Sequence, residues 1–85
     1  MWRETVSRII KSEMSARGVK YQDLSDRLKT LGIQQSADNL RNKINKGILG
    51  ADLFVQILLC LESQALDMVR VKGITEDVKK NAPNK

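Results

Sequence analysis

The stretch GVKYQDLSDRLKTLGIQQSADNLRNKINKG, residues 18–47, decides the fold of this chain. Its apolar residues recur at steps of three and four, the spacing that places side chains on one face of an α-helix. The pattern predicts two helices, over residues 21–31 and 37–46. Their inner faces carry Tyr21, Leu24, Leu28 and Leu31 in the first and Ala37, Leu40 and Ile44 in the second.

Capping residues support these boundaries. Gly32 and Gly47 stand where a left-handed glycine commonly ends a helix, and the Ser36 hydroxyl can accept an early N–H of the second helix. Upstream, residues 3–17 show the same spacing and Gly18 ends them, so a further helix is predicted there. Its stripe consists of Val6, Ile9, Ile10 and Met14.

Residues 51–61 are apolar on nearly every side, which predicts a helix that is either central to the core or shared with a second chain. For residues 66–71 two alternatives stand: a strand, favoured by β-branched residues, or a fifth helix from about residue 64. A lone strand would need a second copy of the chain as its partner. Together with the apolar helix, this leads us to expect a homodimer.

The sequence thus predicts an all-α fold of four to five helices, with a short C-terminal strand as the alternative. We expect one domain over residues 1–72 and a basic, partly disordered tail over residues 73–85. Because the chain has only three aromatic residues, its core is expected to be aliphatic. The Trp2 ring is expected to hold the first helix against that core.

Composition bounds the partners and the compartment. A net charge of +5 in 85 residues favours an anionic partner, either nucleic acid or an acidic protein. The single cysteine, Cys60, allows no intrachain disulfide, which fits a reducing cytosol. The N-terminus does not have the pattern of a signal peptide, and the apolar run over residues 53–61 is too short to span a bilayer. We therefore expect a cytoplasmic protein without a membrane partner.

An enzymatic role is not expected. The chain has no histidine, so the commonest general base and the commonest metal ligand are both missing. Cys60 lies in the most apolar segment, where a thiol behaves as a small hydrophobic group. No glycine-rich phosphate-binding motif is present and the carboxylates are scattered, so neither a cofactor nor a metal is predicted.

Residues 18–25, Gly-Val-Lys-Tyr-Gln-Asp-Leu-Ser, resemble the opening of the second helix in Xre-type, phage-repressor-like helix-turn-helix domains. In those domains Leu is followed by a small residue that lets the next helix cross closely, and Leu24 and Ser25 hold these positions. Residues 39–47 resemble the recognition helix with its closing glycine. The resemblance implies a compact, repressor-like helix-turn-helix domain.

The chain also looks like a group of short bacterial domains of unassigned function, over roughly residues 2–62. The matching residues are Trp2, Glu13, Met14, Arg17, Gly18, Val19, Leu24, Leu28, Gly32, Ile33, Asn39, Leu40, Asn42, Lys43, Ile44 and Gly47. One departure from the repressor-like pattern stands out: Gly32 follows Ser25 by seven positions instead of about four. This lengthens the second helix and affects the angle at which the third would meet a groove.

The resemblance implies a small DNA-binding transcriptional regulator that uses residues 37–46 as its recognition helix. Side chains expected to reach base edges are Gln35, Asp38, Asn39, Arg41, Asn42 and Asn45. Those expected to contact phosphates are Gln34, Ser36, Lys43 and Lys46, with Lys20 and Lys29 adding charge. Arg suits guanine, and Asn or Gln suits adenine.

The alternative is a helix-turn-helix-derived protein–protein module, an antiactivator or antitoxin-like protein that binds another regulator. The residues inserted before Gly32, the modest charge and Asp38 at the entrance of the third helix all fit this alternative. Salt dependence separates the two, because binding driven by phosphate contacts weakens steeply as salt rises.

Overall fold

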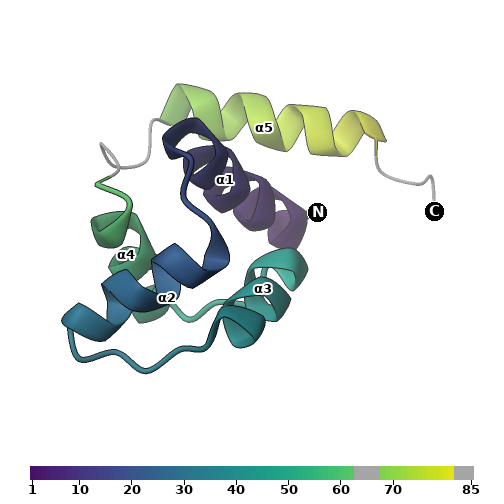
Figure 1. The fold of residues 1–85 in the computed structure, drawn as a ribbon. Helices are drawn as coiled ribbons and strands as arrows, with labels where there is room; N and C mark the ends of the chain where they lie inside the picture. The colour runs from purple at the N-terminus through teal and green to yellow at the C-terminus, as the bar shows by residue number, and fades with distance from the viewer. Residues whose placement is uncertain (63–67, 82–85) are drawn as a thin grey trace.

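The structure is a computed structural model that describes residues 1–62 and 68–81. Within these ranges the chain forms α-helices and no strand (Figure 1). The helices are α1 (Trp2–Arg17), α2 (Tyr21–Thr30), α3 (Ala37–Lys46), α4 (Ala51–Cys60) and α5 (Met68–Asn81). The predicted all-α fold is therefore confirmed for the described part of the chain. None of the described helices is long and apolar enough to cross a membrane.

Local signals place the first four helices within one residue of their predicted ends. Gly18 and Gly47 adopt left-handed φ angles of 63° and 64° and cap α1 and α3. The Ser36 hydroxyl accepts the backbone N–H of Asn39 at 3.1 Å, as the N-cap prediction requires. Stripe and cap together thus suffice to locate these helices.

The C-terminal region shows a fifth helix. A strand is wrong for residues 68–71, which form the first turn of α5, and residues 66 and 67 of the same expectation lie outside the described residues. The helix continues through residues 73–81, where the sequence predicts a tail, so the expected domain boundary falls inside a helix. Residues 82–85 lie outside the described part.

Packing against α1 explains why α5 forms across Gly73. Val78 is fully buried, and the Arg8 guanidinium forms an ion pair with the Asp77 carboxylate between the two helices. Contacts of this kind outweigh the weak helix propensity of glycine and β-branched residues. The paired residues are 69 positions apart in sequence, so no local pattern could have indicated the contact.

The core is aliphatic, as the composition predicts. Its fully buried side chains are Ile10, Leu24, Leu28, Leu40, Ile44, Ile57, Leu61 and Val78. Two expectations about apolar residues are wrong: the Trp2 side chain is 66% exposed and does not anchor α1, and Leu31 is 55% exposed although it continues the stripe of α2. Leu31 comes after the last residue of α2, where the chain turns away from the core.

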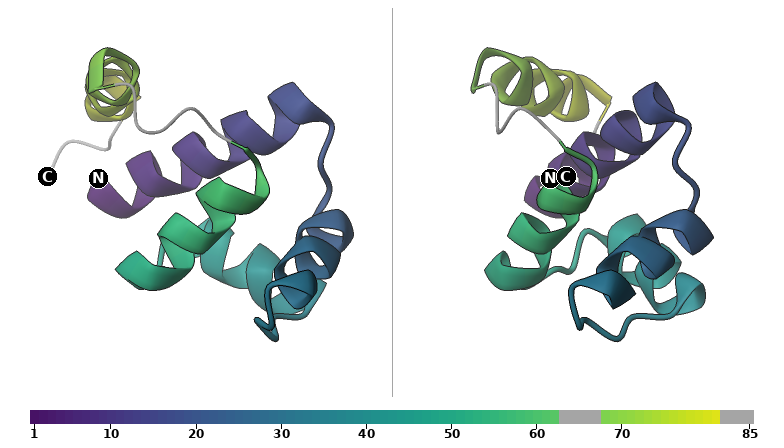
Figure 2. Two further views of the ribbon diagram at one scale, coloured as in Figure 1. Left: turned by 90° about the vertical axis from the view of Figure 1, so that its left-hand side faces the viewer. Right: turned by 60° about the vertical axis from the view of Figure 1, so that its left-hand side comes forward.

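Helix α1 lies between α5 and the other helices (Figures 1 and 2). One side of α1 packs against α3 and another against α5, while α2 packs against α3 and α4. Leu40 and Ile44 are the buried residues of α3, so this helix turns one face to α1 and α2 and its opposite face to solvent. The arrangement leaves the N-terminal end of α3 beside the start of α2.

Gly47 is held by a close backbone approach as well as by its left-handed angle. A Cβ atom at this position would overlap the backbone carbonyl of Arg3 at the start of α1. Gly18 has nearly the same φ, but a Cβ there would meet open space. The two glycines therefore separate the cost of the backbone angle from the cost of the contact.

We predict that Gly18→Ala lowers the free energy of unfolding by about 1–2 kcal/mol, the cost of a left-handed angle for a residue with a Cβ. Gly47→Ala should cost about 1–3 kcal/mol more, because the start of α1 must also move. Urea denaturation followed by circular dichroism measures both. Equal losses for the two variants would contradict the close approach to Arg3.

Candidate nucleic-acid interface

The outer face of α3 is polar and open to solvent. Because Leu40 and Ile44 point into the core, the residues on the far side of the helix are exposed. These are Asp38, Asn39, Asn42, Asn45 and Lys46. Asn is a weak helix former, so the three Asn residues of this short helix lower its intrinsic helix propensity. The Ser36 cap and the buried face of α3 offset that cost.

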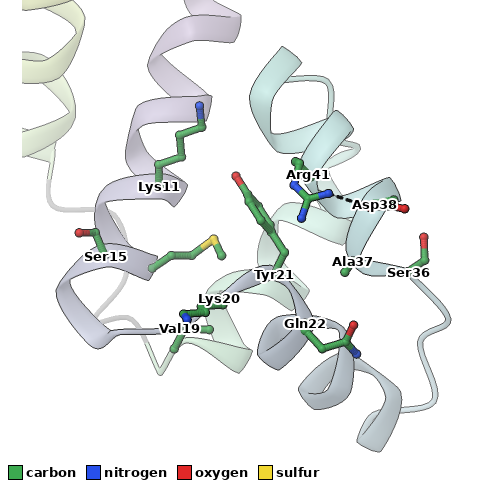
Figure 3. Close-up of a pocket in the computed structure, with 11 residues that line it drawn as sticks. Lys11, Ser15, Val19, Lys20, Tyr21, Gln22, Ser36, Ala37, Asp38 and Arg41 are labelled. Carbon is green, nitrogen blue, oxygen red and sulfur yellow. Dashed lines mark hydrogen bonds and ion pairs between the residues drawn. The ribbon is translucent and has the colours of Figure 1, made fainter.

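A cleft of about 900 Å³ opens where α1, α2 and α3 meet. Its lining consists of Lys11, Met14, Ser15, Val19, Lys20, Tyr21, Gln22, Ser36, Ala37, Asp38 and Arg41. Figure 3 shows the Tyr21 ring standing between Lys11 of α1 and Arg41 of α3. The first residues of both α2 and α3 belong to this lining, so two helix N-termini border the same hollow.

The electrostatics of the cleft favour an anion. Lys11, Lys20 and Arg41 line it, against the single carboxylate of Asp38. A helix N-terminus carries a partial positive charge and unsatisfied N–H groups, and here two of them add to the side-chain charge. One of these backbone N–H groups already has a partner within the protein, since the Asp23 carboxylate accepts the Lys20 backbone N–H at 2.9 Å.

Arg41 is oriented by two neighbours. Its guanidinium donates to the Asp38 carboxylate at 2.6 Å and lies over the Tyr21 ring, 5.3 Å from the ring centroid. A cation over an aromatic face and a charge-assisted hydrogen bond both restrict a long, flexible side chain. The Arg41 side chain is still 50% exposed, so it is positioned and accessible at once.

A second hollow, the loop pocket, lies beside the connection between α2 and α3. It is lined by Gln22, Ser25, Asp26, Lys29, Gln34, Gln35 and Ser36. The Ser25 hydroxyl donates to the Gln35 carbonyl at 2.5 Å, and Lys43 Nζ donates to the Gln35 side-chain oxygen at 3.2 Å. Gln35 and Lys43 are thus only half exposed and hold the connection in place.

The ten residues predicted to form the site therefore do not come together in one place. Ser36, Asp38 and Arg41 line the cleft, while Gln34 and Gln35 line the loop pocket with Ser36. Lys43 reaches toward the connection rather than outward. Asn39, Asn42, Asn45 and Lys46 lie on the exposed face of α3, outside both hollows.

Sequence reasoning did not identify Lys11, Ser15, Tyr21 and Gln22 as site residues, although they line the cleft. Lys11 and Ser15 occupy polar positions of α1 that look like an ordinary solvated face. Tyr21 belongs to an apolar stripe and was expected in the core. A usable signal was available for Tyr21 and Gln22, which begin a predicted helix and so must lie near its N-terminal N–H groups.

Cys60 is buried at the end of α4, 9% exposed. Desolvation by burial raises the pKa of its thiol above the ordinary value, and the nearby positive charge of Arg27 opposes that rise. The thiol is therefore protonated at neutral pH. No group of three His, Cys, Asp or Glu side chains that could hold a metal occurs among the described residues.

We predict that native Cys60 reacts with iodoacetamide at pH 7.5 at least about tenfold more slowly than in urea, because burial and the raised pKa both limit the thiolate. Mass spectrometry of quenched samples measures the rate. Labelling at equal rates in both conditions would show that the thiol is accessible and would contradict its burial.

Residues 2–66 match the model of a protein family described as "Domain of unknown function (DUF6471)". The match agrees with the resemblance to short domains of unassigned function, which covers nearly the same residues. No curated protein and no solved structure matches this chain.

Proposed function

We propose a function for this chain from the geometry of its cleft and of α3. The chain belongs to the family DUF6471, which is described as a domain of unknown function, so the family itself indicates none. The proposal is a small transcriptional regulator that binds double-stranded DNA, with α3 as its recognition helix. One observation carries it: the cleft joins three cationic side chains to two helix N-termini, directly beside the exposed, amide-rich face of α3.

The dimensions of α3 suit a major groove. A helix with its side chains is about 10–12 Å wide, and the major groove of B-DNA is about 12 Å wide. Asp38, Asn39 and Asn42 are exposed on the N-terminal half of α3, the part that reads base edges in repressor-like complexes. Asn pairs with adenine through two hydrogen bonds, and Arg41 beside them suits guanine.

Phosphate contacts would then fall on the cleft. Lys11 and Lys20 reach it from α1 and from the start of α2, on the flank of α3 that also carries Arg41. Contacts to phosphates fix the register of a protein on the duplex, while contacts to bases supply the sequence preference. Phosphate contacts in the cleft would therefore add to the affinity for DNA and would also orient α3 in the groove.

We predict that the protein selects a sequence motif from a randomised duplex pool, and that its binding weakens steeply between about 50 and 200 mM salt. Arg41→Glu should reduce affinity about 10- to 100-fold and remove the motif, because one base contact and one favourable charge are lost. Fluorescence anisotropy on the selected duplex gives the dissociation constants.

The matched control is Lys80→Glu, which makes the same change in net charge on α5. Lys80 is exposed, and α1 separates α5 from α3 (Figure 2). Binding should stay within about twofold of the unaltered protein at 0.15 M salt, where the Debye length is about 8 Å. Equal losses for both variants would mean that only overall charge matters, and absence of binding at low salt would refute the proposal.

A separate prediction concerns Asp38, which we place as a positioning residue for Arg41. Asp38→Asn removes a carboxylate that repels phosphates, so affinity for random duplex should rise about two- to fivefold. The preference for guanine in the selected motif should weaken at the same time, because the 2.6 Å contact that orients Arg41 loses its charge. Glu76→Gln on α5 makes the same charge change and should alter neither quantity. An Asp38→Asn variant with an unchanged motif would contradict the positioning role.

One observation favours the second candidate, a module that binds another regulator. The Asp38 side chain is 85% exposed at the entrance of α3, where a carboxylate opposes the approach of DNA. Binding that resists salt, with an apolar or basic protein surface as the partner, would distinguish this function from the first.

A further inference from the structure

The outward face of α4 is apolar, although its inward face already completes the core. Val55 is 54% exposed and Leu59 66% exposed, and Ala51 is exposed one turn earlier. These residues are four positions apart and form one line along the helix. Leu31, 55% exposed, lies beside Leu59 in a shared hollow at the end of α2. We refer to Ala51, Val55, Leu59 and Leu31 as the α4 stripe.

Arg27 stands at one end of this stripe, with the exposed Glu62 in the same hollow, and Asp52 stands at the other end. Arg27 lines the hollow that contains Leu31 and Leu59, and its guanidinium donates to the Cys60 carbonyl at 2.9 Å. Asp52 lies in the first turn of α4 and is exposed. Among the residues whose side chains the structure describes, neither takes part in an ion pair.

Both charges lie on the same flank of the stripe. Successive residues of a helix are turned by about 100°, which puts Asp52 and Leu59 on the same side of Val55. Arg27 approaches from the side of Leu59 and Cys60. Asp52 and Cys60 are eight residues apart, about 12 Å along the helix, so the two charges are too far apart to pair within one chain.

We propose that the α4 stripe is the contact surface for a second copy of this chain, with the two α4 helices antiparallel about a two-fold axis near Val55. A two-fold axis perpendicular to α4 exchanges the ends of the helix and keeps each flank on its own side. Arg27 of one subunit then faces Asp52 of the partner subunit, and Ala51 faces Leu59 of the partner subunit. Each pair occurs twice, as an isologous interface requires.

The charge pattern favours this occupant over the other arrangements. In a parallel pair, Arg27 would lie at the end of the partner's α4 that carries the partner's own Arg27, about 12 Å along the helix from Asp52. A second copy supplies both the apolar stripe and the two opposite charges at the required spacing. The α4 stripe covers only a few side chains, so the dimer should be in rapid exchange with the monomer at micromolar concentrations, as small interfaces commonly are.

The contact leaves the cleft open. The cleft lies at the first residues of α2 and the hollow of Arg27 and Leu31 at its last residues, about 15 Å apart along a helix of 10 residues. The proposed dimer therefore stands independently of DNA binding, and its test needs no DNA.

Sedimentation velocity over about 1 to 500 μM protein measures the association, a range chosen for weak small interfaces. The expected result is a concentration-dependent shift from monomer to dimer. Leu59→Glu should raise the dissociation constant at least about tenfold, because a charge would be buried against the partner. The control is Ile48→Glu on the loop between α3 and α4: Ile48 is 49% exposed and off the stripe, so its association should match that of the unaltered protein.

A charge exchange tests the antiparallel geometry. Arg27→Glu and Asp52→Arg should each weaken the dimer, and the double variant should recover it, because the two positions meet only between subunits. Circular dichroism confirms that each variant is folded. A protein that stays monomeric at 500 μM, an effect of Ile48→Glu equal to that of Leu59→Glu, or two folded single variants whose combination shows no recovery would each overturn the proposal.

Discussion

Burial of Leu40 and Ile44 between α1 and α2 is the interaction on which the rest of the structure depends. Both side chains are fully buried, and both belong to a helix whose remaining surface is almost entirely polar. Burying two aliphatic side chains of this size contributes several kcal/mol, about 1.5–3 kcal/mol each. That anchoring fixes the rotation of α3 about its own axis, so its amides face solvent and its first turn faces the start of α2.

The ends of α3 are fixed by local chemistry that agrees with this packing. Ser36 begins the helix by accepting the Asn39 N–H, and Gly47 ends it in a conformation that suits glycine. Because Gly47 also lies against the backbone of Arg3, the end of α3 is joined to the start of α1. The close contact directs the following loop, so that α4 returns across α2 and closes the core.

How far the sequence could predict this structure depends on how local each feature is. The helices up to Cys60 follow from stripes and caps a few residues long, and their ends were predicted within one residue. Helix α5 depends on its packing against α1, which joins Arg8 to Asp77, and the pattern near Gly73 gave no sign of that contact. Of the residues that line the cleft, the sequence pointed only to Lys20, Ser36, Asp38 and Arg41 as site residues. The cleft itself could not be predicted, because its lining comes from three helices whose relative positions no spacing rule supplies.

Helix α2 links the two surfaces that have no established partner. Its first residues border the cleft and its last residues border the α4 stripe, while Leu24 and Leu28 hold its inner face in the core. Helix α2 packs against both α3 and α4, and a close-packed interior resists compression and transmits strain. A two-fold contact through α4 would therefore set a fixed separation between two copies of α3. The length of α2 would then decide the distance between the two copies of α3, while the fold of each subunit would stay the same.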